Sequence, residues 1–175
     1  MKKTKEIISD KVAVVNQILP HTNKWAWDLF IDGAANNWMP TEISMAKDIE
    51  QWRSDSLTND EKLVVKRSLG FFAGSESLVA NNLLLSIFKY VTDPECRQYI
   101  LRQAYEESLH NLTVVYCCDS LGLKIGQVYE AYNSIPSIKA KDEFLMNICT
   151  DINRSDFNIN TLEGKREFLR NIITY

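Results

Sequence analysis

A glutamate and a histidine stand three residues apart in the middle of the longest predicted helix. That helix spans residues 93–121, with Asp93 suited to cap its first turn and Gly122 suited to end it. Within it, Glu107 and His110 form a Glu-x-x-His pair. Because residues three apart lie on one face of a helix, the carboxylate and the imidazole project together. Helix bundles place metal ligands in their cores in this way, so the pair is either a ligand pair or an ordinary surface pair.

A second carboxylate, Glu76, lies in an apolar stripe of the preceding helix. Its neighbours at helical spacing are Leu69, Phe72, Ala73, Val79, Ala80 and Leu83. A carboxylate buried there without a partner is strongly destabilised or takes up a proton, so Glu76 either reaches water at the edge of the stripe or binds a metal. The short turn at Thr92 makes the two helices antiparallel neighbours, and Glu76 and Glu107 lie at nearly equal distances from that turn. We therefore expect the two carboxylates to lie level across the pair.

The hydrophobic pattern predicts an all-α protein that forms a single domain over residues 1–175. We expect helices over residues 4–18, 22–35, 44–52, 58–91, 93–121, 124–134, 137–151 and 161–175. Thr58 and Glu61 fit a capping box at the start of the first long helix. Gly70 and Gly74 lie inside that helix, where each costs about 1 kcal/mol against alanine. They indicate close packing of a neighbouring helix.

Composition narrows the classes of protein that remain. The 175 residues are 45% hydrophobic and 25% charged, with a net charge of −3, which does not favour nucleic acid as a partner. We find no apolar run of transmembrane length and no signal peptide, so we expect a cytoplasmic protein without a membrane partner. The four cysteines have no zinc-site spacing and are interpreted as reduced thiols; they are Cys96, Cys117, Cys118 and Cys149.

Five short segments carry a more specific pattern. They are Trp38-Met39-Pro40-Thr41-Glu42-Ile43, Lys47-Asp48-Ile49-Glu50-Gln51-Trp52, Gly70-Phe71-Phe72, Glu76-Ser77-Leu78-Val79 and Ala104-Tyr105-Glu106-Glu107-Ser108-Leu109-His110. These segments resemble the radical-generating small (beta) subunit of class I ribonucleotide reductase, over most of the chain from about Trp25 to Tyr175. The resemblance implies a ferritin-like helical bundle, of which this chain forms half of the dimetal bundle plus N-terminal accessory helices. It also implies that Glu76, Glu107 and His110 are metal ligands and that Trp38 starts the radical-transfer path.

The chain departs from most of that family at position 114. Val114 stands four residues after the helical histidine, where most members have a radical-bearing tyrosine, and Tyr116 lies about 200° further around the helix. A subgroup without that tyrosine stores its oxidising equivalent on a manganese/iron pair, and Glu76, where many members have aspartate, resembles that subgroup too. The resemblance therefore implies a dinuclear metal centre, with Mn/Fe favoured over di-iron or di-manganese.

The resemblance stops at Tyr175, before the family's second Glu-x-x-His. We therefore expect the N-terminal half of a split or truncated small subunit, whose partners are a complementary C-terminal half with the other three ligands and the catalytic (alpha) subunit. A dimeric assembly follows, either of the two halves or of two copies of this chain facing each other. The apolar face that other helices would complete is expected to include Phe72, Val79, Leu83 and Val114.

The implied activity is the reduction of ribonucleotides to deoxyribonucleotides, with a radical sent from the metals through Trp38 to the catalytic subunit. Two alternatives remain open. One is an R2-like manganese/iron ligand-binding oxidase that does not act in nucleotide reduction. The other is a non-enzymatic helical fragment.

Overall fold

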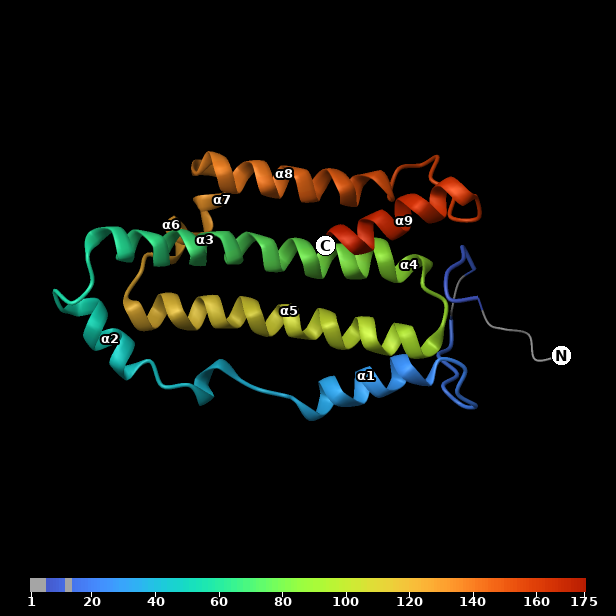
Figure 1. The fold of residues 1–175 in the computed structure, drawn as a ribbon, viewed down its shortest axis with the longest axis horizontal. Coiled ribbons are helices and arrows are strands. Elements are labelled where there is room, and N and C mark those ends of the chain that lie inside the picture. Colours follow the sequence, from blue (N-terminus) through green and yellow to red (C-terminus); the bar gives the residue numbers. More distant parts are fainter. Residues whose placement is uncertain (1–5, 12–13) are drawn as a thin grey trace. The chain divides into compact units, whose positions relative to one another are not determined.

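Helices make up the regular structure of the part of the chain that the computed structural model describes, residues 6–11 and 14–175. The extended pairing within it is an isolated bridge between Ile8 and Val91. The order of the elements (Figure 1) is α1 Lys24–Ala35, the 3-10 turn η1 Pro40–Glu42, α2 Ala46–Arg53, α3 Asn59–Asn81, the π-helical η2 Asn82–Ile87, α4 Phe88–Tyr90, α5 Pro94–Leu121, α6 Ile125–Tyr129, α7 Ala131–Ser134, α8 Pro136–Asp151 and α9 Leu162–Thr174. The predicted all-α class is confirmed.

Two compact units make up the chain, and each is assembled from separated stretches of sequence. Unit 1 comprises the described part of Met1–Asn37 together with Val79–Glu106 and Leu145–Tyr175. Unit 2 comprises Trp38–Leu78 and Glu107–Phe144. That residues 1–175 act as a single domain stays a prediction.

Unit 1 has its own apolar core. Its buried members are Ala26, Leu83, Ile87, Tyr90, Val91, Cys96, Ile100, Ile152, Ile159 and Phe168. Phe168 of α9 is completely inaccessible, and the Tyr90 ring packs edge-on against it with ring centroids 5.9 Å apart. The start of α1, the end of α4 and the start of α5 are thereby fixed around a helix from the far end of the chain.

Two buried carboxylates fasten the segment before α1 in unit 1. Glu95 is 1% exposed and accepts hydrogen bonds from the backbone N–H groups of Thr22 (3.1 Å) and Asn23 (2.8 Å). The Thr22 hydroxyl also donates to Oε2 of Glu95. Nδ1 of His21 lies 2.8 Å from the other carboxylate oxygen, Oε1. Asp93 caps α5 by accepting from the backbone of Glu95 and Cys96, as the sequence predicted. Burial alone would raise the pKa of Asp93 and of Glu95, but these hydrogen bonds hold both pKa values below their usual range.

Unit 2 packs α3, α5 and the short helices α6 and α7 around a smaller core. Its buried members are Ala73, Val114, Cys118 and Val128, with Leu69, Leu123 and Tyr129 packed against them. A Cβ placed on Gly70 would lie 2.5 Å from the Cβ of Ala131 and 3.1 Å from the carbonyl oxygen of Val128. Close packing at Gly70, predicted from its place inside a helix, is confirmed.

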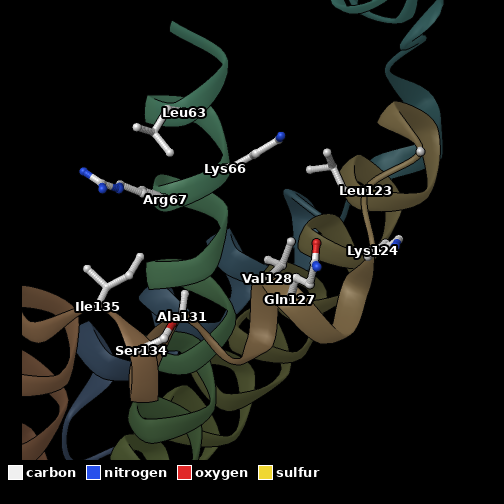
Figure 2. A pocket seen from close by; sticks show the side chains of 11 residues that line it. Leu63, Lys66, Arg67, Leu123, Lys124, Gln127, Val128, Ala131, Ser134 and Ile135 are labelled. Carbon is white, nitrogen blue, oxygen red and sulfur yellow. The ribbon is translucent and has the colours of Figure 1, made fainter. Parts of the chain in front are cut away.

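A pocket of about 460 Å³ opens beside this contact in unit 2 (Figure 2). Lys66 of α3 points toward Leu123, while Arg67 points to the other side of the same helix. Val128 and Ala131 form part of the apolar floor. The carboxylates and the histidine singled out in the sequence are not among its lining residues.

The helix ends follow local sequence signals. Thr58 and Glu61 form the expected capping box: the Glu61 carboxylate accepts from the Thr58 backbone (2.8 Å), and the Thr58 hydroxyl accepts from the Glu61 backbone (3.2 Å). Gly122 ends α5 with a φ of +67°, a conformation that glycine adopts without strain. The predicted helix over 124–134 is two shorter helices that meet at Glu130.

The predicted helix over residues 4–18 is wrong for the part that the structure describes. Residues 6–11 and 14–18 contain no helix. Instead, the backbone N–H of Ser9 donates to the carbonyl of Tyr90, and that of Thr92 donates to the carbonyl of Ile7. These bonds to a distant turn satisfy the backbone in an extended form. Residues 1–5 and 12–13 lie outside the described residues.

The expected uncovered apolar face is only partly present. Phe72 is 46% exposed, as expected, but Leu83 and Val114 are 6% and 4% exposed. The core of unit 1 covers Leu83 and that of unit 2 covers Val114, because neighbouring stretches of this chain already reach them. Val79 is partly buried against the core of unit 1.

One stretch of the described chain, Asn59–Tyr90, is long and apolar enough to cross a membrane by length and composition. The sequence prediction that no run reaches that length is therefore corrected. A core helix of a globular protein meets the same criteria, so this stretch is weak evidence for a membrane span.

Candidate metal centre

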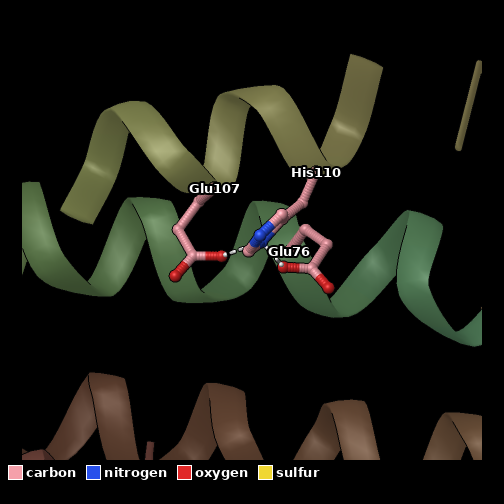
Figure 3. A group of neighbouring side chains, drawn as sticks. All are labelled: Glu76, Glu107 and His110. Carbon is pink, nitrogen blue, oxygen red and sulfur yellow. Dashed lines mark hydrogen bonds and ion pairs between the residues drawn. The ribbon is translucent and has the colours of Figure 1, made fainter. Parts of the chain in front are cut away.

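Three side chains from two antiparallel helices meet in unit 2. Glu76 comes from α3, and Glu107 and His110 come from α5, with the imidazole lying between the two carboxylates (Figure 3). His110 Nδ1 lies 3.1 Å from Oε2 of Glu76 and 3.0 Å from Oε2 of Glu107. One donor atom from each residue lies within 4.8 Å of the other two. The predicted level placement of the two carboxylates is confirmed.

The position of the group is set by the phase of each helix and by a polar contact beside it. The three-residue spacing in α5 brings Glu107 and His110 to the side that faces α3. Next to them, the Ser77 hydroxyl of α3 donates to Oδ1 of Asn111 on α5 over 3.3 Å. The Asn111 amide in turn donates to the backbone carbonyl of Glu107. This bridge joins the two helices one residue after Glu76 and one residue after His110.

Burial differs among the three donors. The side chains of Glu76 and Glu107 are 16% and 10% exposed, whereas that of His110 is 43% exposed. The two carboxylates are thus largely removed from water, and the imidazole marks an open side of the group. A ligand or another segment of protein can reach the donors from that side.

Burial raises the pKa of Glu107 to about 7, together with the Glu76 carboxylate, which acts both through a hydrogen bond and through its charge. Burial alone would lower the pKa of His110, but its contacts with Glu107 and Glu76 outweigh burial and raise it. The negative charges of two carboxylates this close repel each other, and a proton on Nδ1 of His110 would offset part of that repulsion. A bound divalent cation would offset it more strongly.

The donor set fits a first-row transition metal. Carboxylate oxygens and an imidazole nitrogen are ligands that manganese, iron and zinc all accept. The convergence of the three donor atoms and the raised pKa of Glu107 both mark a place where positive charge is favourable. The other histidine, His21, pairs with Glu95 in unit 1 and does not join the group. The four cysteines are free thiols, and burial raises the pKa of Cys96 to about 12.

Trp38 lies against the same histidine. Its ring centroid is 6.1 Å from that of His110, with the planes inclined by 32°. The indole belongs to the segment between α1 and α2, where η1 is closed by a bond from the Ile43 backbone to the Pro40 carbonyl. Trp38, predicted from its motif, and the three donors are thus brought together in one unit.

Two features of this site were missed from the sequence. The first is the Ser77–Asn111 bridge. The second is a hydrogen bond from the Tyr116 hydroxyl to the carbonyl of Ile43 (2.8 Å). Both partners in each pair are far apart in sequence, and no spacing rule connects them.

Comparison with known proteins places the chain in a family. Residues 15–175 match the family model described as ribonucleotide reductase, small chain. The chain belongs to the ribonucleotide reductase small-chain family. A small-chain relative from Chlamydia pneumoniae, a ribonucleoside-diphosphate reductase subunit beta, is 50% identical over 161 residues, covering 92% of this chain and 46% of that relative. The small chain from Neurospora crassa is 29% identical over 128 residues, covering 71% of this chain and 31% of its own length.

Two solved structures show the same fold. The R2 subunit of ribonucleotide reductase from Clostridium botulinum superposes with a TM-score of 0.81 at 23% identity, covering 97% of this chain and 51% of that one. A structure from Bacillus halodurans described as a putative class I ribonucleotide reductase gives a TM-score of 0.73 at 22% identity, covering 86% and 52%. The predicted ferritin-like helical fold is confirmed. The chain spans about half the length, or less, of these relatives.

Proposed function

We propose that this chain supplies the N-terminal part of a ribonucleotide reductase beta subunit and contributes three ligands to its dinuclear metal centre. The observation that carries the proposal is the convergence of Glu76, Glu107 and His110 from α3 and α5, in a chain of the small-chain family. The activity is the reduction of ribonucleotides to deoxyribonucleotides together with the catalytic alpha subunit. We place the protein in the cytoplasm.

The ligand set must be completed from elsewhere. A carboxylate-rich dinuclear centre in a helix bundle takes one glutamate from each of two helices and a Glu-x-x-His from each of two more. The described residues provide one carboxylate helix and one Glu-x-x-His helix. One further carboxylate and one more Glu-x-x-His pair, three ligands together, would make the full set. We propose that a complementary C-terminal segment docks over the open side beside His110; the alternative is a second copy of this chain.

Each residue of the site has a separate role in this proposal. Glu76 and Glu107 would hold the metals through carboxylate oxygens, and His110 through an imidazole nitrogen. When bound, the metals activate oxygen and supply the oxidising equivalent. Trp38, against the His110 ring, would pass that equivalent outward to the catalytic subunit. The bundle would keep the donors in place and exclude water from the carboxylates.

We favour a manganese/iron pair over di-iron or di-manganese. The buried position one helical turn after His110 is Val114, whose side chain cannot carry a radical. The oxidising equivalent would then stay on the metals. Metal analysis and electron paramagnetic resonance of the assembled protein test this, and a stable tyrosyl signal with two irons per site would contradict it.

Activity in the assembled system is the test of the function. The chain is combined with its complementary segment and a catalytic subunit, and deoxyribonucleotide formation is measured. We expect turnover in the complete mixture and none when the chain is omitted. Trp38→Phe should keep the metals but abolish turnover, whereas Trp52→Phe, which removes a ring that contacts Lys62 and Lys66 instead, should retain it.

Other results would favour the two alternatives. Metal-dependent oxygen consumption without deoxyribonucleotide formation, and with Trp38→Phe fully active, would favour an oxidase of the same fold. Failure of the assembled protein to bind metal would favour a non-enzymatic fragment. The contact of Trp38 with His110 is the observation that supports reductase over oxidase.

A further inference from the structure

The segment that carries Trp38 is short, largely exposed and mostly without helix. Between α1 and α2, regular structure is limited to the three residues of η1. Met39 is 39% exposed and Ile43 is 68% exposed. Bonds within the segment shape the turn, since Met39 donates to the Glu42 carboxylate (3.0 Å) and Ile43 donates to the Pro40 carbonyl (3.1 Å). These local bonds do not fix the turn relative to α5.

Two contacts with α5 fix the position of the η1 turn relative to that helix. At one end, the Trp38 ring lies against His110. At the other end, the Tyr116 hydroxyl donates to the backbone carbonyl of Ile43 over 2.8 Å. His110 and Tyr116 are six residues apart on the same helix, which is about 9 Å along its axis at 1.5 Å per residue. A ring contact alone leaves a segment free to pivot, whereas two separated contacts set both its position and its direction.

Because the acceptor is the backbone carbonyl of Ile43, the hydrogen bond from Tyr116 does not depend on which side chain stands at position 43. The bond is directional, because the phenol O–H must point at the carbonyl oxygen. It also holds the C-terminal end of η1, five residues from Trp38, so a movement there is transmitted through a turn that is closed by its own hydrogen bonds. Tyr116 thereby acts on Trp38 without contacting it.

We propose that Tyr116 is a positioning residue that holds the η1 turn on α5 and thereby keeps the Trp38 ring beside His110. Its consequence for turnover rests on the proposed function, since the ring position matters there for passing an oxidising equivalent. The positioning itself does not rest on that function and is measured without metals or substrate.

The test of position uses fluorine NMR of the whole chain labelled with 5-fluorotryptophan. The chain has four tryptophans, and loss of one signal in Trp38→Phe assigns the Trp38 resonance. We expect Tyr116→Phe to shift or broaden the Trp38 resonance and leave the other three in place. The matched control is Tyr105→Phe, which removes the hydroxyl of another partly exposed tyrosine on α5 and should leave all four unchanged.

A second variant separates the hydrogen bond from the packing of the ring. Tyr116→4-aminophenylalanine keeps an aromatic ring of similar size with an N–H donor at its tip. It should return the Trp38 resonance to the position found in the unsubstituted chain. A Trp38 resonance that does not change in Tyr116→Phe, or that moves equally in both variants, overturns the proposal.

The assembled enzyme gives an independent reading. With the complementary segment and the catalytic subunit present, Tyr116→Phe should lower kcat by about threefold to tenfold, the range expected when one hydrogen bond is lost. KM for the nucleotide and the metals per chain should not change. If the unsubstituted assembly makes no deoxyribonucleotide, the proposed function fails while the NMR result still decides the role of Tyr116. If the assembly is active but the Trp38 resonance is unchanged in Tyr116→Phe, the proposed function stands and the positioning role of Tyr116 is overturned.

Discussion

Glu107 shows how one side chain in this chain is set by opposing effects. Burial and the nearby Glu76 raise its pKa to about 7, while the bond to His110 favours its ionised form. In the absence of a cation the group keeps protons that the unfolded chain would release. The same residues therefore make the metal-free chain sensitive to pH and suited to binding a cation.

Stability of the metal-free chain should fall as pH rises. An unfolded glutamate titrates near 4.5, so between that value and about 7 unfolding releases the Glu107 proton, and the raised pKa of His110 adds the same effect at higher pH. We expect the unfolding free energy to fall by on the order of 2 kcal/mol between about pH 5 and about pH 8. Below about pH 4.5 the unfolding free energy should instead fall as pH falls. Asp93 and Glu95 have lowered pKa values, so they stabilise the fold while they are ionised and lose that effect when they take up protons.

Thermal unfolding across this range measures the effect. Glu107→Gln should flatten the loss above pH 5, since the amide has no proton to release. Glu143→Gln, at an exposed position on α8, should keep the slope of the unsubstituted chain. A slope that is identical in all three proteins would contradict the assignment to Glu107.

Metal binding by the assembled protein should depend on each donor separately. Glu76→Ala, Glu107→Ala and His110→Ala each remove one of three converging atoms. Altering even the outer partners of a metal site lowers affinity by about tenfold to a hundredfold, so loss of a direct ligand should lower manganese affinity by at least that amount. Calorimetry and elemental analysis measure it, with Glu143→Gln as the control that should bind normally. Unchanged metal content in any of the three alanine variants would remove that residue from the ligand set.

At the scale of elements, the contact between α3 and α7 decides how closely unit 2 packs. Gly70 is the residue that allows it, because a Cβ there would overlap the Cβ of Ala131. Helix propensity alone would favour alanine at this position by about 1 kcal/mol. The packing and the propensity therefore make opposite predictions for one substitution.

Gly70→Ala should destabilise the chain by about 1–3 kcal/mol, since backbone of α6 and α7 must move to admit the methyl group. Gly126→Ala, where nothing lies within 4 Å of the added Cβ, should be neutral or stabilising by up to about 1 kcal/mol. Adding Ala131→Gly to Gly70→Ala should recover part of the loss. Denaturant unfolding measures the stability of Gly70→Ala, Gly126→Ala and the double variant. A Gly70→Ala chain that is more stable than the unsubstituted chain would show that α7 moves to admit the methyl group at little cost.

Elements whose signals are local could be predicted, and those set by distant partners could not. The Thr58–Glu61 box, the Asp93 cap and the Gly122 stop each involve neighbours in sequence, so the start of α3 and both ends of α5 were expected. The π-helical η2, which ends α3 at Asn81 inside the predicted helix, was not. Residues 6–11 were expected to be helical, and this was wrong. Their backbone instead forms hydrogen bonds with Tyr90 and Thr92, which are distant in sequence and carry no local signal.

The same division applies to the candidate site. Glu107 and His110 were brought together by helical spacing, and Glu76 by its distance from a short turn. The Tyr116 bond was not expected, because its acceptor is a backbone carbonyl 73 residues away. Side-chain identity carries no information about such an acceptor.

At the scale of the whole molecule, the chain leaves much apolar surface in water. In unit 1, Trp25 is 57%, Leu85 is 68% and Ile173 is 81% exposed. In unit 2, Val64 is 64% and Phe144 is 57% exposed. Binding of another protein segment or of a second copy would remove such side chains from water, which is favourable.

The isolated chain should therefore associate in solution, and the complementary segment should replace that self-association by a one-to-one complex. Light scattering coupled to size exclusion measures mass, and elemental analysis measures metals per chain. A monodisperse, metal-free monomer would contradict both assemblies. A homodimer that holds two metals without any partner would favour two facing copies over the complementary segment.

The separated stretches that form the two units have a consequence for biosynthesis. Glu76, Glu107, His110 and Trp38 all belong to unit 2, whose last stretch is finished at Phe144. Unit 1 needs Leu145–Tyr175, including Phe168 at the centre of its core. At about 5–20 residues per second, a ribosome takes roughly 2–6 s longer to deliver that stretch. During translation the donors of the candidate site are thus all present before the core of unit 1 can close.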